Sequence, residues 1–372
     1  MIKPNPFTPQ SGWEPRVFGG REEAISLFSS SLESAASIRP NHLVILGEWG
    51  IGKTSLLKQF RRVAQSKGYP ACFCALSKFT KRDRPLDAVY LIAEEMLMGF
   101  PGPGIDSEGL LKLFSRQKSL SQAQTQFTKF LLELWGKIDA GLAVVLLDDL
   151  QNLLPISNTI DILRAVLSKE EVIKGTRFLF ALSSTPSSWS MFIDKHDPVG
   201  RFFRKRLIVE NLTPGEVEST VENTLEDTGV VFEKEVKEKV SEYTGGHPYE
   251  VQLLSSHLYD SQIGGRVDSS VWGAALLNTL KELGKDYFTS LLSKASEREK
   301  HLLKILAEEK KPLAITDFRN MMIVNRRAGK FPIANIKNFL YRLEEKGIIT
   351  RDRSGNFDIP DRMFREFILK FS

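Results

Sequence analysis

The stretch that decides the fold is Gly47-Glu48-Trp49-Gly50-Ile51-Gly52-Lys53-Thr54. Two glycines with four residues between them, followed by lysine and threonine, form the P-loop pattern. Glycines let the main chain curl so that successive N–H groups face one phosphate, and the helix that follows adds its positive end. Lys53 would supply a cation to the β- and γ-phosphates, and Thr54 a hydroxyl to Mg²⁺. We therefore predict that these eight residues and Ser55 bind a nucleoside triphosphate, with Lys53 also catalytic and Thr54 also a metal ligand.

The residues on either side of the loop agree with this pattern. A short apolar run at 42–46 lies between Pro40 and Gly47 and predicts a buried strand, and residues 53–64 have the spacing of a helix. The alternative is an ordinary glycine-rich turn between a strand and a helix. The strand before the loop and the helix after it favour the phosphate site.

A second candidate feature lies roughly 95 residues further on, where an apolar run at 142–147 ends in Asp148-Asp149. A carboxylate fixed at the end of a buried strand beside the P-loop strand suits the organisation of Mg²⁺. We predict that Asp148 holds the metal, through water, and that Asp149 polarises the attacking water as a general base. The alternative for Asp149 is a helix N-cap or turn residue.

The order of elements predicts an α/β fold. Strands alternate with helices from residue 42 to 210, which indicates a five-stranded parallel sheet covered on both faces. The predicted strands are 42–46, 70–76, 142–147, 177–182 and 206–210.

Beyond residue 212 the sequence predicts helices at 213–228, 233–244, 248–260 and 268–293, with no further buried strand until the end of the chain. The tail then predicts helices at 296–309, 314–322 and 333–346, followed by two short strands around Ser354-Gly355. Three helices and a hairpin in this order are typical of a winged helix-turn-helix, an α+β domain. We therefore predict a P-loop domain at 1–211, a helical lid at 212–294 and a winged helix-turn-helix domain at 295–372.

Composition limits the class of protein. The chain has 372 residues, of which 42% are hydrophobic and 26% charged, as in ordinary globular proteins. It has no apolar run of 18 residues, and the first residues lack the apolar core of a signal peptide, so no membrane association is expected. Its two cysteines, Cys72 and Cys74, lie two apart on a predicted strand and suit buried thiols in a reducing cytoplasm.

The net charge of +5 is concentrated in the tail. Residues 297–370 carry 17 Lys and Arg against 11 Asp and Glu, a net charge of +6, and the rest of the chain has a net charge of −1. Such asymmetry suggests an acidic partner for the tail, most often nucleic acid. The alternative is a solvated surface that happens to be basic.

Together these motifs resemble those of the AAA+/STAND division of P-loop ATPases. More narrowly, the chain resembles the archaeal-type ATPase family, which is related to origin-recognition-type initiators. Residues 17–22 (VFGGRE) resemble the family's segment before the P-loop, residues 245–249 (GGHPY) its lid motif, and residues 357–366 (FDIPDRMFRE) its closing stretch. The resemblance implies ATP as the nucleotide, with Phe18, Arg21, His247 and Pro248 near the adenine.

The resemblance also implies a γ-phosphate sensor and an arginine finger. The sensor would come from Ser183-Ser184-Thr185 after the fourth strand, where we favour Ser184; the alternative is hydroxyls that cap the next helix. A finger acting on a neighbouring subunit would come from a basic cluster, in which we favour Arg204; the alternative is a patch that pairs with nearby acids. The cluster is Arg201, Arg204, Lys205 and Arg206.

Two departures from the better-known AAA+ pattern predict slow hydrolysis. Asp149 stands where many members of the division have glutamate, and the shorter side chain reaches less far toward the water. The lid has His247-Pro248 in place of an arginine directed at the γ-phosphate. Both features favour a switch of the STAND kind over a motor.

The tail's third helix carries the prediction of DNA binding, since in a winged helix it enters the major groove while the wing lies on the backbone. Its apolar residues Ile336, Phe339, Leu340 and Leu343 would face the core, leaving Asn335, Lys337, Asn338, Tyr341 and Arg342 outward or at the margins. The predicted DNA contacts are Arg326, Arg327, Lys330, Lys337, Asn338, Arg342, Arg351 and Arg353. The alternative is a winged helix that contacts protein, which the nearby acids Glu344, Glu345 and Asp352 favour.

The sequence therefore predicts a cytoplasmic Mg-ATP-binding switch with slow ATPase activity and a DNA-binding winged helix. One alternative is a signalling or scaffold ATPase whose winged helix binds a protein partner. Another is a regulator or loader that assembles on DNA as a nucleotide-dependent homo-oligomer, in a ring or filament.

Overall fold

The computed structural model describes residues 3–10, 13–100, 105–114, 119–324 and 335–371. The chain forms two compact units. One comprises Gly20–Glu210, and the other combines Met1–Gly19 with Asn211–Ser372. In the described part of the chain, no helix is both long and apolar enough to cross a membrane.

The first unit contains the predicted five-stranded parallel sheet, with strand order β2-β3-β4-β1-β5. All residues of β1, β3 and β4 are buried, which explains their uninterrupted apolar runs, because helices cover both faces of the sheet. The strands are β1 Leu43–Leu46, β2 Ala71–Ala75, β3 Ala143–Asp148, β4 Phe178–Ser184 and β5 Lys205–Ile208.

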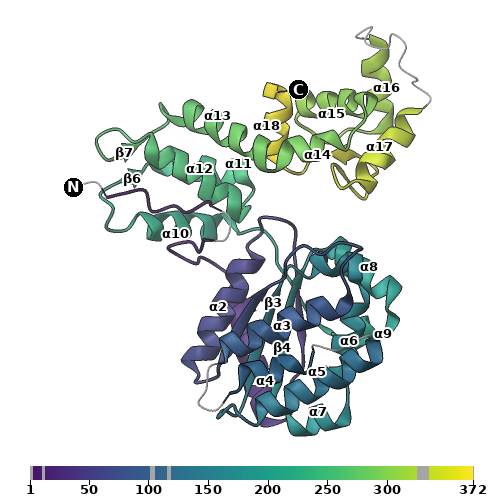
Figure 1. Cartoon of the computed structure of the whole chain (residues 1–372). Helices are drawn as coiled ribbons and strands as arrows, with labels where there is room; N and C mark the ends of the chain where they lie inside the picture. Colours follow the sequence, from purple (N-terminus) through teal and green to yellow (C-terminus); the bar gives the residue numbers. More distant parts are fainter. Residues whose placement is uncertain (1–2, 11–12, 101–104, 115–118, 325–334, 372) are drawn as a thin grey trace. The chain divides into compact units, whose positions relative to one another are not determined.

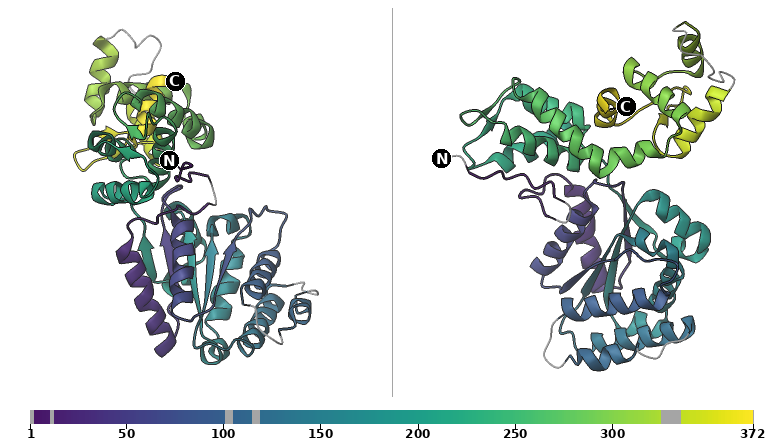
Figure 2. Two further views of the ribbon diagram at one scale, coloured as in Figure 1. Left: turned by 90° about the vertical axis from the view of Figure 1, so that its left-hand side faces the viewer. Right: turned by 45° about the horizontal axis from the view of Figure 1, so that its top comes forward.

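Helices lie on both sides of this sheet. In the left view of Figure 2, α1 (purple) lies on one side and the helices of residues 85–135 (blue) on the other. The described helices of the unit are α1 Glu22–Ser37, α2 Lys53–Ser66, α3 Pro85–Gly99, α4 Ser107–Lys112, α5 Leu120–Trp135, the 3-10 helix Leu150–Ile156, α6 Asn158–Leu167, α7 Glu170–Gly175, α8 Pro186–Lys195 and α9 Asp197–Phe202. The sequence analysis did not predict α4, α7, α8 or α9. Both cysteines are buried and unlinked, and burial raises the pKa of Cys74 to about 12.

The second unit contains the predicted helices with two differences. The segment predicted as one helix at 268–293 is interrupted by a π-helical turn, and two strands of two residues, β6 and β7, pair in parallel. Strands this short carry no periodic signal. The elements are α10 Pro214–Leu225, β6 Val231–Phe232, α11 Lys234–Thr244, α12 Pro248–Asp260, β7 Arg266–Val267, α13 Trp272–Leu283, the π-helix Gly284–Phe288 and α14 Thr289–Ser293.

The tail of the second unit has the predicted order of helices and an antiparallel strand pair. Its elements are α15 Glu297–Glu309, α16 Ile315–Val324, α17 Ile336–Glu345, β8 Thr350–Arg351, β9 Phe357–Asp358 and α18 Arg362–Phe371. Figure 1 shows α18 beside α14 and α15. The ring of Phe288 lies 5.2 Å from that of Phe364 and 5.5 Å from that of Phe367, so α18 joins the tail to the helices that precede it.

The N-terminal residues correct the predicted domain boundary, which assigned them to the P-loop domain at 1–211. Residues 1–19 belong to the second unit. The Lys3 N–H donates to the Thr228 carbonyl over 3.0 Å, and the Asn5 amide donates to the Ser256 carbonyl over 3.0 Å. Phe7 is 4% exposed and stacks on Phe232. The proline-rich arm is too short to form a hydrophobic core by itself. Phe7 is therefore buried in the core formed by helices more than 200 residues away in the sequence.

A buried pair of carboxyl groups also links the tail to α12. Glu250 on α12 is 4% exposed, and its side chain hydrogen-bonds that of Asp361. Asp361 Oδ1 accepts the Phe364 N–H over 2.9 Å at the start of α18. Burial and the Asp361 charge raise the pKa of Glu250 well above its usual value, and burial also raises the pKa of Asp361. The folded protein therefore retains a proton that the unfolded chain releases.

Glu250→Gln should stabilise the protein above about pH 6, because the amide replaces the protonated carboxyl without the proton. A raised folded-state pKa means that wild-type stability falls as the pH rises through the unfolded-state pKa toward the folded-state value. The gain should approach zero near pH 4 and grow as the pH rises to 8, because the wild type must hold a proton that the solution increasingly removes. Urea unfolding at both pH values measures it, with the exposed Glu345→Gln as control. If Glu250→Gln changed the free energy of unfolding equally at both pH values, the folded protein would not retain a proton on the Glu250–Asp361 pair.

Candidate functional site

Two glycines shape the loop between β1 and α2. The Gly47 N–H donates to the Ser184 carbonyl over 3.2 Å, and a Cβ at Gly47 would lie 2.6 Å from the side chain of Ile51. Gly52 has φ +93°, which side chains rarely tolerate, and α2 begins at the next residue. The loop therefore ends at the positive end of a 14-residue helix, where anions are stabilised.

Lys53 is held inside this loop. Its side chain is buried, and Nζ donates to the Glu48 carbonyl over 2.9 Å. Burial lowers the pKa of Lys53, and the charges of Asp149 and Asp148 oppose that effect. The site thus holds a desolvated cation next to two carboxyl groups at the first turn of a helix.

Asp148 is the residue that joins three elements of the site. It is 2% exposed at the end of β3, where Oδ2 accepts the Thr54 hydroxyl over 2.6 Å. Oδ1 accepts the hydroxyl of Ser183, the next to last residue of β4. The Ser183 hydroxyl in turn accepts the Asp149 N–H over 3.0 Å. The P-loop helix, β3 and β4 are therefore tied together through one buried carboxylate.

The sequence analysis favoured Ser184 over Ser183 among the polar residues after the fourth strand. Leu147 pairs with Leu182, so Asp148 lies beside Ser183, whereas the next side chain along β4 points to the other face. The Ser184 hydroxyl is buried and has no hydrogen-bond partner among the described residues, although its carbonyl accepts from Gly47. The Thr185 hydroxyl caps α8, which was the alternative given for this group of hydroxyls. Only the strand register, which no motif encodes, could have singled out Ser183.

Asp149 follows in a left-handed conformation, with φ 60° and ψ 49°. It precedes the 3-10 helix but makes no side-chain capping hydrogen bond, and its Oδ1 instead accepts the Gln151 amide over 2.7 Å. Burial and the Asp148 charge raise the pKa of Asp149, against the Gln151 hydrogen bond and the Lys53 charge. The carboxyl group is therefore positioned by Gln151, a residue that the sequence analysis missed.

The residues predicted to border the adenine fall in both units. Arg21 Nη2 donates to the Ile51 carbonyl over 3.3 Å, which places Arg21 against the P-loop. Phe18, His247 and Pro248 belong to the second unit, where Phe18 is half-buried, His247 precedes α12 and Pro248 is its first residue.

Arg204 lies at the other end of the sheet from the P-loop. It directly precedes β5, whose first residue, Lys205, pairs with Leu43 at the start of β1, whereas the P-loop follows the end of β1. The length of these strands, roughly 10 Å, separates the two ends. Arg204 Nε donates to the Arg201 carbonyl over 3.1 Å, and Lys205 Nζ donates to the Ser31 hydroxyl. Arg204 therefore cannot reach the phosphate site of its own chain.

The tail residues predicted to contact DNA divide into three groups. Arg326, Arg327 and Lys330 lie outside the described residues. On α17 the apolar set Ile336, Phe339, Leu340 and Leu343 is buried, and Asn335, Lys337, Asn338 and Arg342 are exposed, as the helical spacing predicted. Arg353 in the hairpin is exposed.

Arg351 in the hairpin has protein partners. Its guanidinium lies 5.0 Å from the centre of the Tyr341 ring, Nη1 donates to the Tyr341 hydroxyl over 3.1 Å, and Nε pairs with Glu344 at 3.4 Å. Tyr341 also lies 5.5 Å from the ammonium of Lys337. The outer face of α17 and the hairpin thus form one surface around Tyr341, in which Glu344 offsets one basic charge.

Comparison with protein-family models gave no match, and comparison with curated protein sequences gave none either. Solved structures do match. The Walker-type ATPase PABY2304 of Pyrococcus abyssi has a TM-score of 0.67 at 15% identity, over 96% of this chain and 97% of that one. The Aeropyrum pernix ORC2 protein in ADPNP-ADP complexes has a TM-score of 0.64 at 15% identity, over 97% and 96%. The A. pernix ORC1 protein in complex with DNA has a TM-score of 0.52 at 16% identity, over 97% and 94%.

The chain shares the fold of PABY2304 and of the ORC2 protein. The similarity spans nearly the whole length of each chain, and the parallel sheet described above belongs to that fold.

Ser183→Ala should destabilise the first unit, because it leaves the Asp149 N–H without its acceptor and Asp148 without one donor. We expect a loss of about 1–3 kcal/mol in the free energy of unfolding, measured by urea denaturation. The matched control is Ser184→Ala, which removes a buried hydroxyl with no partner among the described residues and should be neutral or stabilising. Equal losses of unfolding free energy in the two variants would contradict the stabilising role of the Ser183 hydrogen bonds to Asp148 and Asp149.

Proposed function

We propose that the protein is a Mg-ATP-binding switch that hydrolyses ATP slowly. The observation that carries the proposal is the meeting of Lys53, Thr54 and Asp148 at the end of β1 and β3, with Thr54 Oγ1 2.6 Å from Asp148 Oδ2. Residues 47–55 would bind the phosphates through main-chain N–H groups and Lys53. Arg21 supports this placement through its contact with the Ile51 carbonyl.

ATP is the nucleotide we propose, with the adenine near Phe18, Arg21, His247 and Pro248. This rests on the motifs around these residues and on the ADPNP-ADP complexes of the ORC2 protein, which has the same fold. We place the protein in the cytoplasm, because Cys72 and Cys74 are unlinked thiols that suit a reducing compartment.

The side chains of Thr54, in the first turn of α2, and Asp148, at the end of β3, fit Mg²⁺. Mg²⁺ prefers oxygen ligands and is usually held by one or two carboxylates together with substrate phosphates and water. Thr54 and Asp148 offer a hydroxyl and a carboxylate already in contact, and the described residues contain no group of three or more acidic, histidine or cysteine side chains suited to a metal. Bound there, Mg²⁺ would neutralise charge on the phosphates. Thr54 and Asp148 are the proposed metal-holding residues.

Asp149 is the proposed general base. Its raised pKa makes it a stronger base than an ordinary aspartate, and the Gln151 amide fixes the orientation of its carboxyl group. Its side chain is shorter than the glutamate of many relatives, which favours slow turnover. Ser184 is the proposed γ-phosphate sensor, because its carbonyl accepts the N–H of the first P-loop residue and its buried hydroxyl has no hydrogen-bond partner among the described residues.

We also propose that the tail is a winged helix, at 295–372, that follows a helical lid at 212–294 and binds DNA. The order of α15, α16 and α17 with the strand pair β8–β9 supports this, as do the exposed Lys337, Asn338, Arg342 and Arg353. The ORC1 protein, which has the same fold, is in complex with DNA in its solved structure. The rival is a protein-binding tail, which the Arg351–Glu344 pair favours by reducing the basic charge.

A second candidate is a nucleotide-dependent oligomer. Arg204 can act as an arginine finger only on the phosphate site of another chain, because it lies at the opposite end of the sheet from its own P-loop. Such a contact would raise the rate of hydrolysis by about 10³-fold or more.

Lys53→Ala should weaken ATP binding by about one to three orders of magnitude, because it removes the cation of the loop. Isothermal titration measures the affinity, and circular dichroism checks the fold. The control is Lys67→Ala, which changes the exposed lysine at the far end of α2. ATP affinity equal to that of the wild type in a folded Lys53→Ala protein would refute the site.

Asp149→Asn should bind Mg-ATP normally but slow single-turnover hydrolysis by about 10²-fold or more, since an amide cannot accept the proton. In the wild type the rate should fall at low pH as Asp149 takes up a proton, and its raised pKa moves that fall above the usual aspartate range. In Asp149→Asn the hydrolysis rate should not show this fall at low pH. Asp139→Asn, which changes an exposed aspartate, is the control. A wild-type rate in Asp149→Asn would make Asp149 a structural residue.

Arg353→Ala should weaken DNA binding and reduce the slope of log K against log salt by about 0.9, the effect of one lost phosphate contact. Arg351→Ala should reduce it less, because Glu344 already offsets part of its charge. Fluorescence anisotropy at several salt concentrations measures the slope, with Arg266→Ala on β7 as control. No binding by the wild type at low salt, with or without ATP, would favour the protein-binding tail.

A further inference from the structure

A cavity of about 540 Å³ opens at the end of the sheet opposite the P-loop. It lies where β1 and β4 begin and where α1 and α6 end, wholly within the first unit. Its apolar lining includes Ile38, Leu167, Phe178 and Phe202. A cavity of this size and composition suits a small molecule with an apolar body. Of the described residues that we propose to bind or hydrolyse ATP or to contact DNA, Arg204 alone lines this cavity.

Two arginines give the cavity a positive charge. Arg39 and Arg204 are exposed lining residues, and no lining residue is acidic. Among the described residues Arg39 has no hydrogen bond or ion pair, and Arg204 uses Nε to bind a carbonyl, which leaves its two terminal nitrogens for a ligand. Guanidinium groups bind carboxylates through paired hydrogen bonds that are stronger than those between neutral groups.

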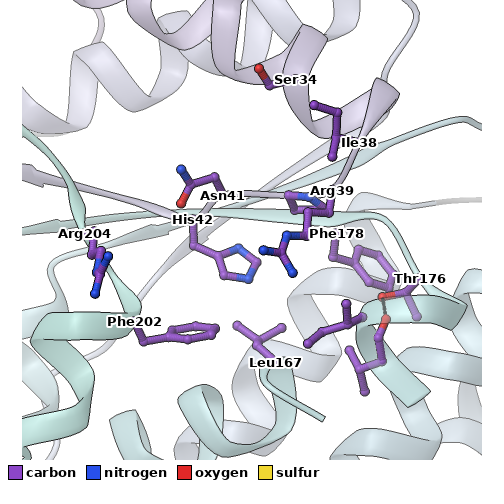
Figure 3. Close-up of a pocket in the computed structure, with 13 residues that line it drawn as sticks. Ser34, Ile38, Arg39, Asn41, His42, Leu167, Thr176, Phe178, Phe202 and Arg204 are labelled. Atoms are coloured by element: carbon purple, nitrogen blue, oxygen red, sulfur yellow. Dashed lines mark hydrogen bonds between the residues drawn. The ribbon is translucent and has the colours of Figure 1, made fainter. Parts of the chain in front are cut away.

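His42 adds a neutral donor. It is 8% exposed, and its Nδ1 accepts the Phe180 N–H over 3.1 Å. Burial lowers the pKa of His42 to about 4, so the ring is neutral at pH 7. A neutral imidazole that accepts at Nδ1 carries its proton on Nε2. The ring lies 5.3 Å from that of Phe202, and Figure 3 shows it projecting into the cavity among Arg39, Phe202 and Leu167.

We propose that this cavity binds a small carboxylate with an aromatic or branched aliphatic body. The carboxylate would accept hydrogen bonds from Arg39 and His42 Nε2, Arg204 on the other side of the His42 ring would add positive charge, and the apolar body would lie against Leu167, Phe178 and Phe202. A neutral donor beside two cations selects an acceptor with negative charge, and the absence of an acid from the lining disfavours a zwitterion or a cation. The site is separate from the proposed ATP site and does not depend on it.

Titration of the full chain with 3-phenylpropionate, followed by isothermal calorimetry, tests the proposal. Two matched probes separate the parts of the ligand: 3-phenylpropionamide keeps the ring without the charge, and propionate keeps the charge without the ring. We expect saturable binding of 3-phenylpropionate and at least tenfold weaker binding of both other probes. Equal affinity for the acid and the amide, or no saturable binding up to 20 mM, would overturn the proposal.

Variants locate the binding. Arg39→Ala/Arg204→Ala changes two exposed residues, so it should fold normally and should lower the affinity at least tenfold. Arg206→Ala changes an exposed arginine of β5, two residues beyond Arg204, that does not line the cavity, and it should bind as the wild type does. Lys53→Ala should also bind the probe normally, since it alters only the phosphate site. Wild-type affinity in the double arginine variant, or lost binding in Lys53→Ala, would place the probe elsewhere and refute the site.

Discussion

The buried carboxylate of Asp148 is the interaction on which the candidate site depends. Its two oxygens accept hydroxyls from Thr54 in the P-loop helix and Ser183 in β4, so three elements far apart in the sequence are fixed to one another. A carboxylate that is 2% exposed is costly unless its hydrogen bonds are made, and here both oxygens have a donor. The same contacts hold Asp149 in place, because the Ser183 hydroxyl accepts its N–H.

Asp149 has both an unusual backbone conformation and a carboxyl group whose pKa is raised. Its left-handed conformation is unusual for a residue with a side chain, and such conformations concentrate at functional sites. The turn directs the chain into the 3-10 helix, from which Gln151 reaches back to the carboxyl group. Burial beside Asp148 makes Asp149 more basic, and the Lys53 charge limits that effect. The two adjacent acids therefore have different hydrogen-bond partners: Asp148 accepts two hydroxyls, and Asp149 accepts the Gln151 amide.

Local patterns predicted the five parallel strands, the P-loop and the Asp148-Asp149 pair, because each of these depends on residues close together in the chain. The contacts that the sequence analysis missed depend on residues far apart. Ser183 is distinguished from Ser184 only by the register between β3 and β4. The arm that carries Phe7 packs on Phe232 and Tyr259, which no local pattern could indicate. The cavity around His42 likewise forms only when β1, β4 and the end of α6 come together.

The central claim is that Asp148 and Thr54 form the metal-binding end of an ATP site. Isothermal titration of ATP in the presence of Mg²⁺ and in the presence of EDTA, with wild type and Asp148→Asn, tests it most directly. We expect Mg²⁺ to strengthen ATP binding by the wild type at least tenfold, and Asp148→Asn to lose most of this dependence while keeping metal-free binding. Identical Mg²⁺ dependence in a folded Asp148→Asn protein would contradict it.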